Sequence, residues 1–439
     1  MSNPIENLRV GFVGMTHLGL VSATAVAAKG FSVIGYDSDP LLIAAVQSLQ
    51  LPIEEPQLKE HMRVSGERLQ FTANRDLLSL CDVLYISADV PTRSDHHSDL
   101  SCIERWMMEV LPIVQGKKIV LVILSQVPPG FTRRWAGQIE VLFYQVETLI
   151  FGQALDRALH PERFIVGCRD PKQALPSTYT ALLQAFECPI FAMRYESAEL
   201  AKISINLLLV SSVMAANMLA EVSTAVGADW GEIVPTLQQD QRIGLRAYIQ
   251  PGLGIAGGNL ERDMVTLASL GESMEIPVDL IHTWFFQSDY QKTWVYRVLQ
   301  KYLLPFCAHP RIAILGLAYK AHTHSTKNSP SLAIIKQLQD FTIVAHDPVV
   351  ALDAVPFVER GMTVEDTIKE ADVVMVLTPW PHYDDIQPLF LKKFMRGRWV
   401  IDPYRQWNCQ ALEQAGFYVL TLGRPISTVL QQEHEHVET

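Results

Sequence analysis

Short apolar runs alternate with longer helical stretches over the first 194 residues of the chain. The apolar runs occupy residues 8–14, 31–37, 82–88 and 118–124. Nearly continuous runs of valine, isoleucine and leucine are typical of strands that are buried on both faces of a parallel sheet. Residues 20–30, between the first two runs, predict a helix. The pattern therefore predicts a Rossmann-like α/β domain with a doubly wound parallel sheet over residues 1–194.

The pattern changes between residues 195 and 300, where no clear strand occurs. One helical pattern continues from residue 196 to residue 226, so we expect a central helical domain that contains a long helix. The alternation of strands and helices then restarts and predicts a second Rossmann-like, doubly wound domain over residues 301–430. Residues 431–439 are polar and predict a flexible tail.

Composition and charge narrow the class of protein. The 439 residues carry a net charge of -11 without an acidic block, which argues against nucleic acid or an anionic membrane as a partner. The six cysteines form no CxxC pair and the N-terminus does not resemble a signal peptide, so we expect reduced thiols in a cytoplasmic protein. The longest strongly apolar stretch, Leu207–Ala220, is too short and too polar to predict a membrane span.

An incomplete dinucleotide-binding fingerprint joins the first predicted strand to its helix. Gly14 and Gly19 match the outer glycines of G-x-G-x-x-G, while Thr16 stands at the middle glycine. That glycine normally lets the backbone approach a pyrophosphate, so Thr16 adds bulk where the phosphates would lie. Asp37 ends the second strand at the spacing of a carboxylate that binds the adenosine ribose, which favours NAD over NADP. The alternative is an α/β domain that has kept only the scaffold.

Several later motifs occur in a fixed order and together resemble one family. They lie at residues 52–56, 125–130, 161–167, 198–206, 227–229, 240–244, 251–254 and 315–320. This ordered set resembles the UDP-glucose/GDP-mannose dehydrogenase family over nearly the whole chain. The resemblance implies an NAD domain, a helical dimerisation section and a nucleotide-sugar domain, with a UDP-sugar favoured as the substrate. It also implies a homodimer through the central helix. The apolar stripe of Leu207, Val210 and Met214 on this helix predicts either buried core or a dimer seam.

The resemblance also implies a chemistry in which a sugar C6 alcohol is oxidised to a carboxylate with two NAD. A cysteine thiol traps the aldehyde, and oxidation of the adduct gives a thioester that water hydrolyses. Lys202 and Asn206 match the residues that hold the developing oxyanion and order a water. Glu147 matches a catalytic glutamate and Asp263 an aspartate near the reacting water. The alternatives are a surface lysine, a packing asparagine, a solvated glutamate and a helix-capping aspartate.

The cysteine loop departs from the family pattern G-x-G-x-G-G-x-C-x-P-K-D. The chain has Asn259 at the thiol position, between a glycine run and Asp263. An amide cannot become a thiolate or form the covalent intermediate. None of the six cysteines lies nearby in the sequence to replace it.

Further expected contacts divide between the cofactor and the substrate. The expected cofactor-binding residues are Gly14, Thr16, Leu18, Gly19, Asp37, Val90 and Gln126. The expected substrate-binding residues are Arg242, Tyr248, Gly254, Gly257, Lys320 and Lys327. Val90 and Gln126 stand where the family keeps threonines, and Lys327 replaces an arginine, so it offers a point charge instead of a fork. We expect no metal site, because His322 and His324 have no further ligands at suitable spacing.

Three functions remain open at this point. The first is an NAD-dependent nucleotide-sugar oxidoreductase whose chemistry is altered by Asn259. The second is a nucleotide-sugar-binding pseudoenzyme or regulatory subunit, which the combined loss of the thiol, the middle glycine and two threonines favours. A complete dehydrogenase that reaches the acid by another route is the least favoured of the three, because it lacks the covalent step.

Overall fold

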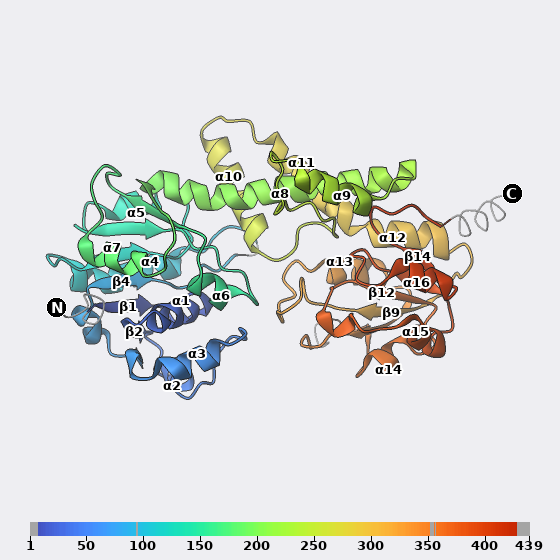
Figure 1. The fold of residues 1–439 in the computed structure, drawn as a ribbon, viewed down its shortest axis with the longest axis horizontal. Coiled ribbons are helices and arrows are strands. Elements are labelled where there is room, and N and C mark those ends of the chain that lie inside the picture. Colours follow the sequence, from blue (N-terminus) through green and yellow to red (C-terminus); the bar gives the residue numbers. More distant parts are fainter. Residues whose placement is uncertain (1–7, 94, 352–354, 356, 428–439) are drawn as a thin grey trace. The chain divides into compact units, whose positions relative to one another are not determined.

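The computed structural model describes residues 8–93, 95–351, 355 and 357–427 (Figure 1). The chain divides into two compact units, Met1–Ile205 and Asn206–Thr439. Their boundary falls inside the long helix α8 (Tyr195–Val226), which confirms the expected long central helix. The division into three domains stays a prediction.

The first unit is built on an eight-stranded sheet in the order β3-β2-β1-β4-β5-β6-β7-β8. Its strands are β1 (Arg9–Val13), β2 (Ser32–Tyr36), β3 (Leu69–Thr72), β4 (Val83–Ile86), β5 (Val120–Ile123), β6 (Leu142–Gln145), β7 (Phe164–Cys168) and β8 (Ile190–Arg194). The order from β3 to β6 is that of a doubly wound nucleotide-binding sheet, as predicted. The pair β6–β7 is antiparallel, because β7 starts at the sheet edge where β6 ends.

Helices cover both faces of this sheet. They are α1 (His17–Ala28), α2 (Pro40–Gln47), α3 (Leu58–Ser65), α4 (Ser101–Val114), α5 (Phe131–Trp135), α6 (Ala154–Leu159) and α7 (Ser177–Gln184), with 3₁₀ turns η1 (Gly66–Arg68) and η2 (Arg75–Leu80). Side chains of one strand alternate between two cores, so that Phe12 packs into one and Val13 into the other. All residues of α1 except Ala28 are buried, and the helix starts directly after the turn that follows β1.

The helix α8 also bears on the expected absence of a membrane span. Among the described residues it is the one helix of at least 18 residues that is long and apolar enough to cross a membrane by length and composition. Only 39% of its most apolar window is buried. The apolar run Leu207–Ala220 is shorter than the apolar part of this helix, because it leaves out the apolar turns on either side.

The second unit begins with helices and ends with a sheet. After the second part of α8 come α9 (Trp230–Gln239), α10 (Asn259–Ser273), α11 (Asp279–Lys292), α12 (Trp294–Val298) and the π-helical turn η3 (Leu299–Leu303). The sheet contains β9 (Arg311–Leu315), β10 (Thr342–His346), β11 (Glu359–Arg360), β12 (Val373–Val376), β13 (Trp399–Ile401) and β14 (Tyr418–Leu420). The helices beside it are α13 (Pro330–Gln337), α14 (Val364–Ile368), α15 (Pro388–Phe394) and α16 (Cys409–Gln414), with a 3₁₀ turn η5 (Pro381–Tyr383).

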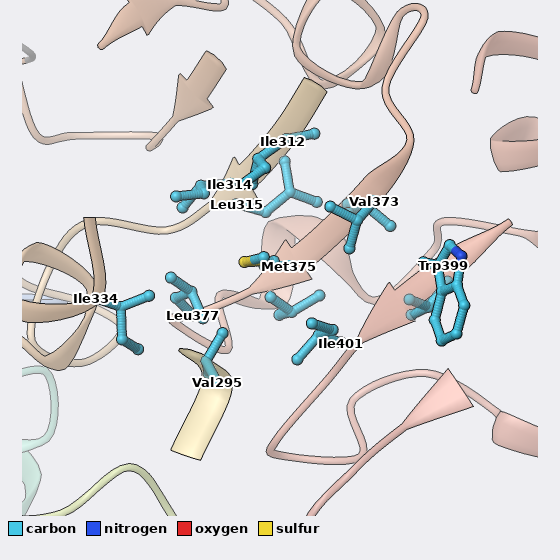
Figure 2. Packing of buried hydrophobic residues seen from close by; sticks show 14 of the residues in the cluster. Val295, Ile312, Ile314, Leu315, Ile334, Val373, Met375, Leu377, Trp399 and Ile401 are labelled. Atoms are coloured by element: carbon cyan, nitrogen blue, oxygen red, sulfur yellow. The ribbon is translucent and has the colours of Figure 1, made fainter. Parts of the chain in front are cut away.

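All neighbouring strands of the second sheet are parallel, in the order β11-β10-β9-β12-β13-β14. This is again a doubly wound order, as predicted. Figure 2 shows its core, in which Val295 of α12 and Ile334 of α13 join buried residues of β9, β12 and β13. The helix α12 and the turn η3, which precede the sheet, therefore share its hydrophobic core.

Candidate functional site

The turn between β1 and α1 retains the geometry of a nucleotide-binding loop. Gly14 has φ +94°, and a Cβ there would lie 2.7 Å from the Cβ of Ala88. A Cβ on Gly19 would lie 2.0 Å from the carbonyl oxygen of Gly14. Both positions therefore require glycine for steric reasons. The N–H of Gly14 donates to the carbonyl of Tyr36, which ties the turn to the end of β2.

Asp37 lies directly beside this turn. Its Oδ2 accepts the N–H of Met15 at 2.9 Å, and its Oδ1 accepts the N–H of Asp39 at 3.1 Å. The residue is only 7% exposed. The sequence placed this carboxylate at the end of β2, and the structure adds that it also holds the glycine turn.

The other side of the turn contacts Asp89, which follows β4. The N–H of Asp89 donates to Oγ1 of Thr16 at 2.8 Å, and Oδ2 of Asp89 accepts the N–H of Leu18 at 3.2 Å. The Thr16 hydroxyl makes no cap bond to its own helix. The first turn of α1 is thus capped by a carboxylate from a distant loop, a contact that sequence reasoning missed.

The two remaining cofactor candidates flank the same region. Val90 is 8% exposed and packs into the core that contains Val13. Gln126 is partly buried and follows Ser125, whose hydroxyl donates to the carbonyl of Ala88. Val90 therefore offers an apolar wall and no hydroxyl to a ligand.

Glu147 lies just after β6 and is partly buried. Burial raises the pKa of its carboxyl to about 7, while the N–H of Thr148 and the positive charges of Lys202 and Arg157 act in the opposite direction. The Thr148 N–H donates to Oε1 of Glu147 at 2.5 Å. A carboxyl with a pKa near neutrality is suited to proton transfer at physiological pH. The structure thus brings Glu147 and Lys202 into electrostatic contact, as the sequence could only suggest.

A small cavity of about 50 Å³ opens next to Glu147. Its walls include Gln145, Arg157 and Arg163. Gln145 Oε1 accepts hydrogen bonds from the hydroxyls of Tyr85 and Tyr179, at 3.2 and 2.8 Å. These polar groups fix the backbone that carries Glu147, and no motif in the sequence pointed to them.

Glu55, from the motif at residues 52–56, fastens the loop before α6. Its carboxylate accepts the N–H groups of Gly152 and Ala154 at 3.0 and 2.7 Å. It also lies 3.1 Å from Nε2 of His17 at the start of α1. The motif therefore has a structural role in shaping the loop that follows Glu147.

In the second unit, Asn206 and Asp263 meet directly. Nδ2 of Asn206 donates to Oδ2 of Asp263 at 2.5 Å, and Asp263 is 1% exposed. Asp263 belongs to α10, which begins at Asn259, one turn earlier. Lys202 lies one turn before Asn206 on α8. The helical spacing places Lys202 beside Asn206, and Asn259 beside Asp263, each pair along one helix face.

The glycine loop before α10 runs close to the segment that follows β9. Gly257 has φ +76°, and a Cβ there would lie 2.9 Å from the ring of Tyr319. A Cβ on Gly258 would lie 3.0 Å from Cε of Lys327. Gly254 has φ +90°, and its Cβ would lie 2.6 Å from the carbonyl oxygen of Ser288. The loop thus needs its glycines, and it places the Asn259 position close to Lys327.

Three cationic side chains, those of Lys327, Arg262 and Lys320, lie in or near this loop region. Burial lowers the pKa of Lys327, and the charge of Arg262 lowers it further. Arg262 lies 3.6 Å from Oδ1 of Asp263. Nζ of Lys320 lies 5.8 Å from the ring of Tyr319, over its face. These charges suit a phosphate-bearing ligand.

The other two substrate candidates are exposed. The Arg242 side chain is 89% exposed and forms two hydrogen bonds with the carboxylate of Asp240. Tyr248 is 62% exposed.

The chain has two doubly wound sheets, and the first unit adds a glycine turn held by Asp37. It also contains the carboxyl of Glu147, with a pKa of about 7, beside Lys202. Together these features are typical of a dinucleotide-dependent oxidoreductase. Residues 8–187, 196–285 and 313–408 match the NAD binding domain, the central domain and the UDP binding domain of the UDP-glucose/GDP-mannose dehydrogenase family. The chain belongs to this family. NAD is accordingly its cofactor, and a nucleotide sugar is its class of ligand.

The similarity to individual relatives extends over nearly the whole chain. UDP-glucose 6-dehydrogenase TuaD of Bacillus subtilis (strain 168) is 26% identical over 435 residues, which cover 95% of this chain and 93% of that protein. UDP-glucose 6-dehydrogenase of Rhizobium meliloti (strain 1021) is also 26% identical, over 95% of this chain and all of its own length. The expected family is thereby confirmed.

Solved structures agree on the fold. A UDP-glucose dehydrogenase from Pyrobaculum islandicum superposes with a TM-score of 0.82 at 23% identity, over 96% of this chain and 99% of that chain. A UDP-D-ManNAc dehydrogenase from Pyrococcus horikoshii gives a TM-score of 0.79 at 24% identity, over 95% and 99%.

The residues of the first unit fit NAD at two of three points. Gly14 and Gly19 keep the geometry of the turn, and Asp37 stands where a ribose diol binds. The third point does not fit in this conformation, because the carboxylate of Asp89 accepts an N–H at the N-terminus of α1, where a pyrophosphate binds in this fold.

Proposed function

We propose that this protein is an NAD-dependent nucleotide-sugar oxidoreductase that interconverts an alcohol and an aldehyde without carrying the oxidation on to the acid. The proposal rests on the bonded pair Asn206 and Asp263, with Asn259 one turn before Asp263 on the same helix. The nicotinamide, when bound, supplies the hydride acceptor. An amide at position 259 forms no thiohemiacetal, so the second oxidation has no covalent intermediate.

The proposed proton transfer depends on Glu147 and Lys202. The carboxyl of Glu147 exchanges a proton near neutral pH, because burial raises its pKa to about 7. The ammonium of Lys202 stabilises negative charge that develops on the substrate oxygen. Asn206, held by Asp263, presents its carbonyl oxygen in a fixed orientation, since its amide nitrogen is already bonded. Glu147 and Lys202 are the proposed catalytic residues, and Asp263 is a positioning residue.

The proposed substrate is a UDP-sugar. Lys320 and Lys327 supply positive charge in the second unit, and the part of the chain around them matches a UDP binding domain. The two relatives described above are named for UDP-glucose. A lysine at position 327 binds phosphate as a point charge, so the sugar nucleotide is oriented less strictly than by a guanidinium.

The direct test is to count NADH. Purified protein is incubated with NAD and a panel of UDP- and GDP-sugars, and NADH is measured per sugar consumed. We expect one equivalent, together with an aldehyde that a hydrazine reagent traps. Two equivalents and a uronic acid product would contradict the proposal.

A companion variant separates the missing thiol from other changes. Asn259→Cys restores the family residue, and Asn259→Ser serves as a control of similar size without a thiol. We expect acid production only with the cysteine. If the cysteine variant still stops at one equivalent, the loss of acid formation does not arise from position 259 alone.

A second candidate function is a nucleotide-sugar-binding or regulatory subunit without turnover. The observation that favours it is the Asp89 carboxylate at the N-terminus of α1, which leaves the cofactor site incomplete. In that case no sugar yields NADH, while a UDP-sugar still raises the melting temperature. Turnover with any sugar of the panel would rule it out.

We further propose a cytoplasmic homodimer that is formed through α8. All six cysteines are free. Along the part of α8 that lies in the second unit, several large apolar side chains are exposed: Leu208, Met218, Leu219, Val222 and Val226. Leu208→Glu places a charge in the proposed interface and should convert the dimer to a monomer in light scattering. A wild-type monomer would contradict the proposal.

A further inference from the structure

We propose that Asp89 occupies the position of the cofactor pyrophosphate and thereby sets a weak affinity for dinucleotides. The inference rests on the proposed use of NAD, but it concerns binding and not turnover. Asp89 would act as a specificity-determining residue, because it penalises ligands that carry phosphate at this point and spares those that do not.

Asp89 forms two hydrogen bonds at the start of α1. Oδ2 of Asp89 lies 3.2 Å from the N–H of Leu18, in the first turn of α1. The N–H of Asp89 donates to Oγ1 of Thr16 at 2.8 Å. Asp89 is therefore held in place by two hydrogen bonds, one made by its backbone N–H and one accepted by its carboxylate.

The N-terminus of α1, where the carboxylate of Asp89 lies, is a position that favours anions. A helix N-terminus attracts anions, since its first N–H groups have no partner within the helix and its dipole is positive there. In doubly wound folds the pyrophosphate of a dinucleotide binds to this terminus, after the glycine turn. An aspartate carboxylate satisfies the same donor, so the two anions compete for one place.

Thr16 strengthens the competition. At the middle position of the fingerprint, glycine would offer neither a hydroxyl nor a β-branched side chain. Thr16 instead accepts the backbone bond that holds Asp89 against the turn. The two changes act together, because the threonine fixes the loop and the aspartate supplies the charge.

The second unit offers an internal comparison. Gly316 has φ +97°, and its N–H donates to the carbonyl of His346, as that of Gly14 does to Tyr36. The pairing of β9 with β12 places Val376 opposite Leu315, whereas Ile86 lies opposite Val13. Counting on from these pairs, Pro379 corresponds to Asp89. A proline side chain accepts no hydrogen bond, so the blocking carboxylate is particular to the first unit.

The test measures binding by calorimetry on the full-length protein. The probes are NAD, ADP-ribose and adenosine, and the variants are Asp89→Ala, Asp89→Asn and Thr16→Gly. Asp95→Ala is the matched control, because Asp95 lies on the same loop and its charge faces Arg93 and His97 instead of α1. Melting curves without ligand verify that each variant is folded.

We expect Asp89→Ala to lower the Kd for NAD and ADP-ribose by about tenfold or more, since a negative charge beside the phosphates is removed. The Kd for adenosine should stay within twofold, because adenosine reaches Asp37 and not the helix N-terminus. Asp89→Asn should give an intermediate gain, since it keeps an acceptor but loses the charge. Thr16→Gly should also tighten NAD binding.

Several results would overturn the inference. They are an unchanged or weaker Kd for NAD in Asp89→Ala, an equal gain for adenosine, an equal gain in Asp95→Ala, and NAD binding that stays undetectable in every variant. Failure of the proposed reaction is a separate outcome, because a variant that binds NAD tightly and yields no NADH would contradict the proposed function and leave this inference standing.

Discussion

The two doubly wound units build the same turn from different sequences. In each, a glycine with φ above 90° follows the first strand, Gly14 in one and Gly316 in the other. In each, an aspartate after the next strand accepts N–H groups of that turn, Asp37 in the first unit and Asp347 in the second. The backbone geometry is therefore shared, and the ligand that each turn accepts depends on the residues around it.

The difference lies in what the neighbouring central strand presents. After β4 the first unit places Asp89 against the helix N-terminus, whereas the corresponding residue after β12 in the second unit is Pro379. A carboxylate at that place repels phosphate, while a proline side chain carries no charge. The comparison shows that an intact scaffold does not guarantee an intact phosphate site.

The largest predicted effect concerns the glycines that the first turn requires. Gly19→Ala should destabilise the protein by about 3 kcal/mol, because the new Cβ would meet the carbonyl oxygen of Gly14. Gly316→Ala should have a comparable effect in the second unit, where the Cβ would meet Thr378. Urea unfolding measures both. Gly137→Ala is the control, since nothing lies within 4 Å of its Cβ, and an equal loss there would refute the steric explanation.

The next effect compares the two aspartates. Asp347 accepts the N–H groups of Leu317 and Ala318 and the indole N–H of Trp380 on one oxygen, and two further N–H groups on the other. Asp37 accepts two N–H groups. Asp347→Ala should therefore lower the free energy of unfolding by about 2–3 kcal/mol, and Asp37→Ala by less. The reverse order in urea unfolding would break the comparison.

A pH effect of up to about 3 kcal/mol is expected from Glu147. Its pKa in the folded protein is about 7, above the ordinary value of 4.5. The folded state thus binds the proton more tightly, so stability is fully present below pH 4.5 and is lost as the pH rises through 7. Burial raises the pKa of Asp402 in the second unit to about 6, which gives a loss of the same sign at lower pH.

Glu147→Gln separates the two titrations. In chemical unfolding between pH 4 and pH 8, the variant should lose less stability than the wild type across the upper part of this range. The decline due to Asp402 should remain. If the two proteins follow the same curve, Glu147 does not titrate near neutral pH in the folded state.

The smallest predicted effect concerns Lys327. Lys327→Arg should lower the Kd for UDP by less than about tenfold, because a guanidinium binds phosphate through two N–H groups and keeps its charge when buried. Lys320→Arg is the matched control, and calorimetry with UDP measures both. A higher Kd for Lys327→Arg would show that the space beside Gly258 admits lysine but not the broader guanidinium of arginine.

Much of the fold and part of the site could be predicted from local patterns. Buried strands produce apolar runs and a nucleotide turn requires glycines, so both sheets and the position of Asp37 could be predicted from neighbouring residues. The antiparallel pair β6–β7 could not be predicted in this way, because the direction of a strand depends on the end of the sheet at which the preceding loop brings the chain back. The exposed positions of Arg242 and Tyr248 likewise depend on packing that no motif encodes.

The contacts that decide what the site can bind could not be predicted from local patterns. The sequence by itself determined two doubly wound domains, a long central helix, a threonine in the fingerprint and an amide at position 259. Only the tertiary structure decided that Asp89, 73 residues from Thr16, closes the N-terminus of α1. It also decided that Glu147 has a pKa near 7 beside Lys202. Charge, burial and hydrogen bonding act through space, so residues distant in the chain decide what a local motif can bind.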